Sequence, residues 1–237
     1  MTIIMGKNTI KAVLEKNSGR FLTVYVDRAK KDDEIVRLLG KADIPYELVP
    51  ASRLEALCGS ASHQGFAAKV KDREFLELKT FLQNRGEKSL VVMLDSIVDP
   101  HNFGAILRSC ECFGVAAVIF SKNRGAPLSP AVTKVSCGAS ELLPLIRVSN
   151  LAEALRQLQK EGFVAMLADI NESAVALGSF VPPDLSVLIM GSEKCGAQAL
   201  IKKMADRTVY IPMQGYIDSL NVAQAASVCL YALAGVS

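Results

Sequence analysis

Residues 90–94 read L-V-V-M-L, the first of five short apolar, β-branched runs that decide the fold class of this chain. The other runs lie at residues 115–120, 163–168, 185–190 and 208–211. Helical patterns separate them, at residues 103–113, 129–137, 150–161, 197–204 and 219–234. Continuous apolar strands that alternate with helices indicate a parallel sheet covered on both faces. We therefore predict a parallel-sheet α/β domain over residues 89–237.

The first third of the chain alternates between shorter elements. Helices are expected at residues 9–16, 32–41 and 53–58, and strands at residues 21–26, 46–49 and 65–70. Ser52 precedes the third helix and Glu55 lies three residues later, which is the pattern of a capping box. This part of the sequence predicts a small α/β domain over residues 1–72.

Residues 73–88 join the two predicted domains. The segment is strongly charged and carries a single apolar stripe, formed by Phe75, Leu78, Phe81 and Leu82. Such a stripe at helical spacing predicts a linker that passes into a helix.

The composition is that of an ordinary globular protein, with 50% hydrophobic and 22% charged residues among 237. No apolar run approaches the roughly 18 residues that a membrane helix needs, and the first residues lack a secretory pattern. Six cysteines occur without a C-x-x-C pair, and two histidines are too few to suggest a zinc site. We expect a cytoplasmic protein with no membrane partner and no metal.

The net charge of +3 comes from the first third of the chain. Residues 1–75 hold 13 Lys and Arg against 10 Asp and Glu, whereas residues 76–237 hold 14 against 14. A surplus of three charges permits a nucleic-acid partner and does not by itself indicate one.

Polar and small residues follow three of the predicted strands, where ligands bind in an open parallel sheet. After residues 90–94, Asp99-Pro100 marks a turn, Asn102 occupies an N-cap position, and Arg108 lies in the second helical turn. A capped helix with a solvent-facing arginine is the alternative interpretation of this segment.

The other two segments follow residues 185–190 and 208–211. Gly191-Ser192-Glu193-Lys194-Cys195-Gly196 is a short glycine-bounded loop that leads into a helix, so its amides are available to a polar ligand. The loop is neither a G-x-G-x-x-G fingerprint nor a P-loop, so it does not indicate dinucleotide or triphosphate binding. Taken alone, Glu193 fits a surface residue as well as a site residue. The third segment, I-P-M-Q-G-Y-I-D-S-L-N-V-A at residues 211–223, places Ser219 and Asn221 where helix caps also occur.

Together, the three segments resemble the three motifs of the SpoU/TrmH family of RNA ribose 2'-O-methyltransferases, in family order. The matching residues are Asn102, Gly104 and Arg108; Gly191, Glu193 and Gly196; and Ile211, Pro212, Ser219, Leu220 and Asn221. Gly6-Lys7-Asn8 and His63-Gln64-Gly65 resemble the RNA substrate-binding domain that precedes many such enzymes. The resemblance thus covers nearly the whole chain.

The resemblance implies a fold of the SPOUT type, with a trefoil knot in the last third of the chain, and a homodimer whose active site draws on both subunits. It implies S-adenosylmethionine as cofactor, held by the loops around Gly191, Ile211, Met213 and Leu220. The reaction that the resemblance implies is methyl transfer to a ribose 2'-hydroxyl.

The resemblance also implies roles for individual side chains. Arg108 is the family's activator of the hydroxyl, although a guanidinium stays protonated at neutral pH and is equally suited to clamp the adjacent phosphate. The remaining catalytic candidates are expected to position the ribose, Arg108 and the cofactor; they are Asn102, Glu193, Ser219 and Asn221.

RNA recognition is assigned to the first domain, with Lys7, Lys11, Arg20 and Arg28 as candidate phosphate contacts. The two-domain layout most resembles enzymes that methylate a guanosine ribose in 23S rRNA. A transfer RNA substrate and a non-catalytic RNA-binding or ribosome-assembly role are the alternatives. A nicotinamide-dependent oxidoreductase is disfavoured because the glycine fingerprint is missing.

Overall fold

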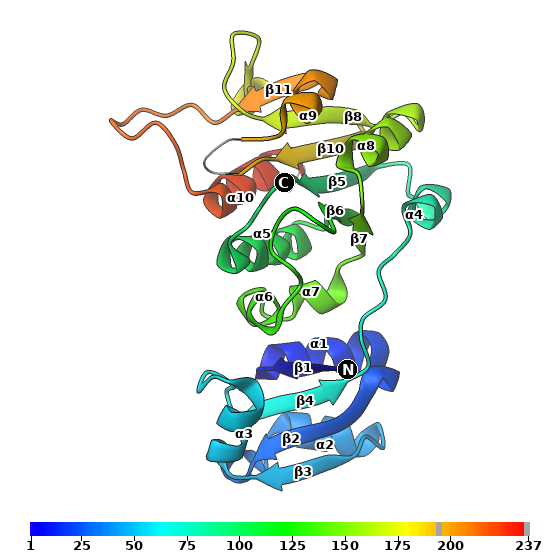
Figure 1. Ribbon diagram of the computed structural model, residues 1–237, viewed down its shortest axis with the longest axis vertical. Coiled ribbons are helices and arrows are strands. Elements are labelled where there is room, and N and C mark those ends of the chain that lie inside the picture. The colour runs from blue at the N-terminus through cyan, green and yellow to red at the C-terminus, as the bar shows by residue number, and fades with distance from the viewer. Residues whose placement is uncertain (193–195, 235–237) are drawn as a thin grey trace. The chain divides into compact units, whose positions relative to one another are not determined.

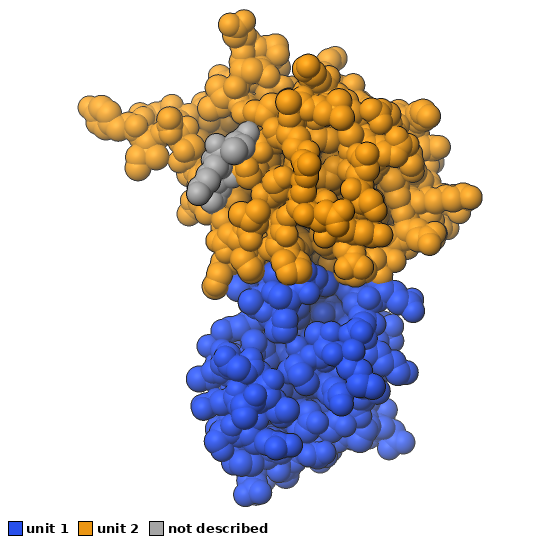
Figure 2. All heavy atoms as spheres, viewed as in Figure 1, with its two compact units in different colours: residues 1–74, 128–142 blue, residues 75–127, 143–237 orange. Residues whose placement is uncertain are grey.

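The computed structural model describes residues 1–192 and 196–234 and divides into two compact units (Figure 2). Unit 1 comprises residues 1–74 and 128–142, and unit 2 comprises residues 75–127 and 143–237. Residues 128–142 lie, in sequence, inside the segment that we expected to form the second domain, but in space they pack with the first.

Unit 1 is built on a four-stranded sheet with the strand order β1-β4-β2-β3 (Figure 1). The strands are β1 (Thr2–Met5), β2 (Phe21–Asp27), β3 (Tyr46–Val49) and β4 (Phe66–Val70). β4 pairs antiparallel with β1 and β2, and β2 pairs parallel with β3. The edge strand β1 was not predicted, because it follows directly on the N-terminus and is too short to show a period.

Five helices belong to unit 1. They are α1 (Lys7–Asn17), α2 (Glu34–Lys41), α3 (Ala51–Cys58), α6 (Pro130–Val135) and α7 (Ala139–Leu142), with the 3-10 turns η1 (Ser18–Arg20) and η2 (Arg28–Lys30). The core of the unit forms between α1, α2 and the sheet, around Ile10, Val13 and Phe66. The expected capping of α3 by Ser52 is wrong: the helix begins at Ala51, after Pro50, and no side chain caps it.

Residues 128–142 are held against the rest of unit 1 by a close backbone contact, an ion pair and a hydrogen bond. Gly138 lies against α1, where an added Cβ would lie 3.0 Å from the carbonyl oxygen of Asn8, and its φ of +92° further favours glycine. Arg20 forms an ion pair with Glu141, and Arg73 donates to the carbonyl oxygen of Ser140. The Arg20 and Glu141 side chains are only 14% and 4% exposed, so this is an interior ion pair.

Unit 2 contains a seven-stranded, wholly parallel sheet with the strand order β7-β6-β5-β10-β8-β11-β9. The strands are β5 (Ser89–Leu94), β6 (Ala117–Ser121), β7 (Leu145–Val148), β8 (Val164–Ala168), β9 (Val175–Ala176), β10 (Leu185–Met190) and β11 (Arg207–Tyr210). The five predicted runs are all strands. β7 and β9 were missed because they are short edge strands, one of which carries the exposed Arg147.

Helices cover both faces of this sheet, as the continuous apolar strands predict (Figure 1). The helices of unit 2 are α4 (Leu78–Asn84), α5 (Pro100–Cys112), α8 (Leu151–Lys160), α9 (Ala199–Met204) and α10 (Val222–Leu233), and η3 (Leu177–Ser179) is a 3-10 turn. α4, α8 and α9 pack against the strand face that includes Met93 and Ile119. On α5, Phe103 contacts Phe120 with ring centroids 5.2 Å apart.

Two helix starts bear on the site. Asp99 caps α5 by accepting a hydrogen bond from the His101 N–H, and Pro100 occupies the first turn, where a missing N–H costs nothing. The expected N-cap role of Asn102 is therefore wrong, because Asp99 is the N-cap and Asn102 lies within the first turn of α5. Asn221 does cap α10, by accepting from the Ala223 N–H.

The predicted fold class, a small α/β domain with a parallel-sheet α/β domain, is confirmed. The trefoil knot stays a prediction. Within residues 1–192 and 196–234, no helix is long and apolar enough to cross a membrane.

Candidate active site

The strand order of unit 2 reverses between β5 and β10. The chain proceeds from β5 to β6 and β7 on one side, and β8, β10 and β11 lie on the other. Loops diverge at such a switch point and leave a crevice beyond the carboxyl ends of the strands. The segments that contain the first and second predicted motifs begin at these two strand ends, at Asp95 and Gly191.

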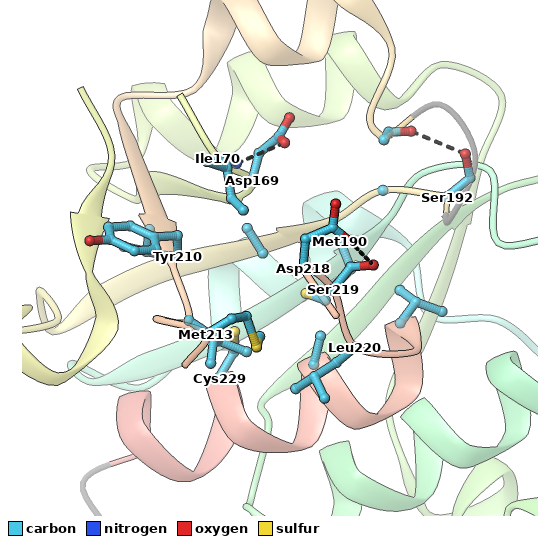
Figure 3. Close-up of a pocket in the computed structure, with 17 residues that line it drawn as sticks. Asp169, Ile170, Met190, Ser192, Tyr210, Met213, Asp218, Ser219, Leu220 and Cys229 are labelled. Atoms are coloured by element: carbon cyan, nitrogen blue, oxygen red, sulfur yellow. Dashed lines mark hydrogen bonds between the residues drawn. The ribbon is translucent and has the colours of Figure 1, made fainter. Parts of the chain in front are cut away.

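A pocket of about 250 Å³, pocket A, lies beyond the carboxyl ends of β8, β10 and β11 (Figure 3). The predicted cofactor residues all line it: Gly191, Ile211, Met213 and Leu220. Ser219, Cys229 and the acidic side chains Asp169 and Asp218 also take part, and no Lys or Arg is found among the described residues of its lining. Pocket A therefore combines apolar surface with an acidic rim.

Gly191 has to be glycine because the backbone of Gly196 and Ala197 lies directly against it. An ideal Cβ on Gly191 would lie 2.2 Å from the backbone nitrogen of Ala197 and 2.2 Å from the carbonyl carbon of Gly196. The close approach is held by two backbone hydrogen bonds between Ser192 and Gly196, of 3.0 and 2.8 Å. Backbone groups, rather than side chains, thus form this wall of pocket A.

Two further features of pocket A follow from charge and burial. Asp169 forms an ion pair of 2.6 Å with Lys202. Cys229 lies on α10 beneath the pocket, and burial raises the pKa of its thiol to about 11. The thiol is therefore neutral at physiological pH and contributes apolar surface.

A second pocket, pocket B, has a volume of about 380 Å³ and includes residues 96–99, Asn102, Ala197 and Gln198. Ser192, Gly196 and Val222 line both pockets, so A and B are neighbours. The Nδ2 of Asn221 donates a hydrogen bond of 3.0 Å to Oδ1 of Asn102, which joins the first and third motifs across 119 residues of sequence.

Asp95, which the sequence analysis did not select, holds this region together. Its carboxylate is fully buried at the end of β5 and accepts hydrogen bonds from the backbone N–H and the side-chain amide of Gln198, both at 2.7 Å. The Ser96 hydroxyl donates to it as well, at 3.0 Å. A polar residue directly after an apolar strand was the available signal, but any loop begins in the same way.

The structure separates the remaining catalytic candidates. Ser219 lines pocket A, where its hydroxyl donates to Asp218 at 3.1 Å (Figure 3). Arg108 is exposed on α5 and is not among the residues that line pocket A or B. Glu193 lies outside the described residues.

The basic candidates of unit 1 also differ from one another. Lys7 forms an ion pair of 2.9 Å with Asp33, which lowers the pKa of that carboxyl against the opposing effect of burial. Lys11 and Arg28 are exposed. Arg20 forms an interior ion pair with Glu141, so little of its guanidinium is accessible to an RNA phosphate.

Pocket A suits a sulfonium cofactor by its donor set. The Asp218 carboxylate complements positive charge, the apolar residues can cover an adenine ring, and the backbone at Gly191 adds polar groups to the wall. No cluster of His, Cys, Asp and Glu with metal-binding geometry occurs in the part of the chain that the structure describes.

Two family models match the chain. Residues 89–231 match the SpoU rRNA Methylase family, and residues 3–76 match the model for RNA 2'-O ribose methyltransferase substrate binding. The first match alone covers more than half of the chain.

Curated relatives match over almost their whole length. The 23S rRNA (guanosine-2'-O-)-methyltransferase RlmB of Vibrio cholerae is 36% identical to this chain over an alignment of 241 positions. The alignment covers 97% of this chain and 94% of the relative. The enzyme of the same name from Coxiella burnetii is 35% identical, with 96% and 93% covered.

Among solved structures, the SpoU methyltransferase AviRb from Streptomyces viridochromogenes, in complex with AdoMet, has the same fold. It superposes with a TM-score of 0.81 over 98% of this chain and 88% of its own, at 24% identity. The three motifs, the two matched models and these relatives agree, and the chain belongs to the SpoU rRNA methylase family.

Proposed function

We propose that this protein transfers a methyl group from S-adenosylmethionine to the ribose 2'-hydroxyl of a guanosine in 23S rRNA. The observation that carries the proposal is the joining of the first and third motifs by the bond between Asn221 and Asn102, beside pocket A. The names of the relatives, which match both units of this chain, support the substrate.

In the proposed arrangement, pocket A holds S-adenosylmethionine, which supplies an electrophilic methyl group. Leu220, Met213 and Ile211 provide its apolar contacts, and the backbone at Gly191 provides polar ones. The carboxylate of Asp218 favours a cationic ligand over a neutral one, whereas that of Asp169 is already paired with Lys202.

Pocket B is the place for the target ribose. It adjoins pocket A through Ser192, Gly196 and Val222, which brings a hydroxyl in B next to a ligand in A. Asn102 lines B, and its bond to Asn221 holds its side chain in a fixed orientation at the wall where the ribose would lie. Asn102 is uncharged and would position the ribose without acting as the base, so the hydroxyl proton released on methyl transfer would pass to another group or to water.

Arg108 acts on the 2'-hydroxyl or on the neighbouring phosphate, either as the activator or as a bidentate clamp. Since it lies outside the linings of A and B in its own chain, we propose a homodimer in which Arg108 serves the partner's site. Exposed apolar side chains support burial by a second copy: Tyr216 and Ile217 in the loop before α10, and Val228 and Tyr231 on α10 itself.

Unit 1 is proposed to select the RNA, with Lys7, Lys11 and Arg28 as phosphate contacts. Arg20 is not carried into this proposal because of its interior ion pair. The proposed 23S rRNA substrate supports a cytoplasmic location for the protein.

The test is to incubate the purified protein with tritiated S-adenosylmethionine and separate samples of unmodified 23S rRNA and transfer RNA, followed by nucleoside analysis. Labelled 2'-O-methylguanosine from 23S rRNA is the expected result. Label in transfer RNA alone would replace the substrate, and cofactor binding without label in either RNA would favour the non-catalytic role.

A further inference from the structure

A third pocket, pocket C, lies beyond the carboxyl ends of β6 and β7 and has a volume of about 470 Å³. The polar side chains in its lining are Ser121, Asn123, Arg124, Ser149, Asn150 and Gln198. Among its described residues there is a guanidinium and no carboxylate, the opposite of pocket A. Pocket C therefore favours an anionic occupant.

Arg124 is held in place by a relay that starts in the interior. Asp95, fully buried, binds both the backbone N–H and the side-chain amide of Gln198. This fixes the Gln198 carbonyl oxygen, which accepts a hydrogen bond from one terminal nitrogen of Arg124. An exposed arginine is thus oriented before any ligand arrives, which reduces the entropy lost on binding.

The positive charge of Arg124 is not neutralised by its partner, because an amide is uncharged. Among the described residues, no carboxylate lies within 4.0 Å of the Arg124 guanidinium. Arg20, Arg85 and Arg156, by contrast, each form an ion pair with a glutamate. A guanidinium with one bond to a neutral anchor retains N–H donors for an oxyanion.

Pocket C continues the line of the other two pockets. Gln198 lines both B and C, and Ser192, Gly196 and Val222 line both A and B. The three pockets follow the carboxyl edge of the sheet, from an acidic end to a basic end. A nucleic-acid strand with its reacting ribose in B would carry its phosphodiester backbone out through C.

We infer that pocket C is a subsite for a backbone phosphate of the RNA, next to the target nucleotide, with Arg124 as its main contact. This inference rests on the proposed function, which supplies the RNA strand and places the ribose in B. Arg124 pairs with two phosphate oxygens, and Asn123 and Ser149 add uncharged donors. The subsite sets the register of the strand and reads no base.

The experiment measures RNA affinity as a function of salt concentration, together with methyl transfer, for the full-length protein and an unmodified 23S rRNA transcript. Arg124→Gln removes the charge but keeps a polar side chain, whereas Arg124→Lys keeps the charge. Gln198→Ala removes the anchor but leaves Arg124. Arg156→Gln, on the exposed side of α8, is the control for the loss of one surface charge.

Arg124→Gln should weaken RNA binding roughly ten-fold and lower the slope of log affinity against log salt by about 1. Arg124→Lys should restore the slope and part of the affinity, and Gln198→Ala should keep the slope. Cofactor affinity should be unchanged in the Arg124 variants. The inference is overturned if Arg124→Gln keeps the wild-type slope, or if Arg156→Gln lowers it equally.

Failure of the proposed function would be recognised separately. If the wild-type protein binds RNA but forms no 2'-O-methylated nucleoside, the methyl-transfer proposal fails. The salt slopes still decide whether Arg124 contacts a phosphate, because they are measured on binding alone.

Discussion

Asn221 and Asn102 are joined by a hydrogen bond of 3.0 Å, from Nδ2 of Asn221 to Oδ1 of Asn102. Asn221 also caps α10 through its own Oδ1, which accepts from the Ala223 N–H at 2.9 Å. One side chain therefore fixes the start of a helix and orients a residue of pocket B. These two roles can be separated by substitution.

Asn221→Asp should keep the cap and lose the donor to Asn102. We expect its free energy of unfolding to stay close to that of the wild type while methyl transfer falls at least ten-fold. Asn221→Ala loses both roles and should also cost about 1 kcal/mol of stability. Urea unfolding and single-turnover methylation measure the two effects, and an active Asn221→Asp variant would contradict the role of this bond in catalysis.

Arg108→Ala should abolish methyl transfer and leave the dissociation constant for S-adenosylmethionine nearly unchanged. The reason is that Arg108 lies on α5, outside the lining of pocket A. Isothermal titration with the cofactor and a methylation assay on the same preparation check this. A loss of cofactor affinity comparable to the loss of activity would refute the assignment.

Mixed dimers test whether Arg108 serves the partner's site. In a dimer of one Arg108→Ala subunit and one Asn221→Asp subunit, the site of the first subunit has its own wild-type Asn221 and receives the wild-type Arg108 of the second. A mixture of the two variants should therefore regain activity. If the mixture is no more active than either variant alone, each Arg108 works within its own chain.

Gly191→Ala should abolish cofactor binding, because the new Cβ would lie 2.2 Å from backbone atoms that cannot move without opening the loop. Gly178→Ala is the matched control, since nothing lies within 4 Å of a Cβ there. We expect the control to bind the cofactor like the wild type. Normal binding by Gly191→Ala would show that the loop tolerates a different conformation.

Arg20→Ala should destabilise the protein by about 3 kcal/mol, because it leaves the buried Glu141 carboxylate without its partner. The double variant Arg20→Met with Glu141→Leu should recover most of that loss. The salt dependence of RNA binding should be the same in the double variant as in the wild type. A reduced slope would instead make Arg20 a phosphate contact, as the sequence suggested.

Cys229 should make stability fall at alkaline pH. Its thiol has a pKa of about 11 in the folded protein, whereas an exposed thiol ionises near pH 8.5. Between these pH values only the unfolded state loses the thiol proton. The contribution of the neutral Cys229 thiol to the free energy of unfolding is therefore complete below about pH 8.5 and is lost as pH rises to about 11. The difference in unfolding free energy between wild type and Cys229→Ala, measured at pH 8 and pH 10.5, should shrink accordingly.

The sequence by itself predicted the fold class of unit 2, a parallel-sheet α/β domain, and the identity of the family, but not the edge strands β7 and β9. Five apolar runs became parallel strands because a strand buried on both faces has to be apolar throughout, and that pattern is visible without coordinates. The motif residues were identified through their resemblance to the family's three motifs, which occur here in the same order.

Only the tertiary structure decided how distant residues combine. Residues 128–142 belong to unit 1 because Gly138 and Glu141 find their contacts on α1 and Arg20, which lie more than a hundred residues earlier. Asp95 can accept hydrogen bonds from Gln198 only because β5 and β10 are neighbouring parallel strands, so that their carboxyl ends lie side by side. Local patterns carry propensity and periodicity, whereas these bonds depend on strand order, which brings distant segments together after the sheet has formed.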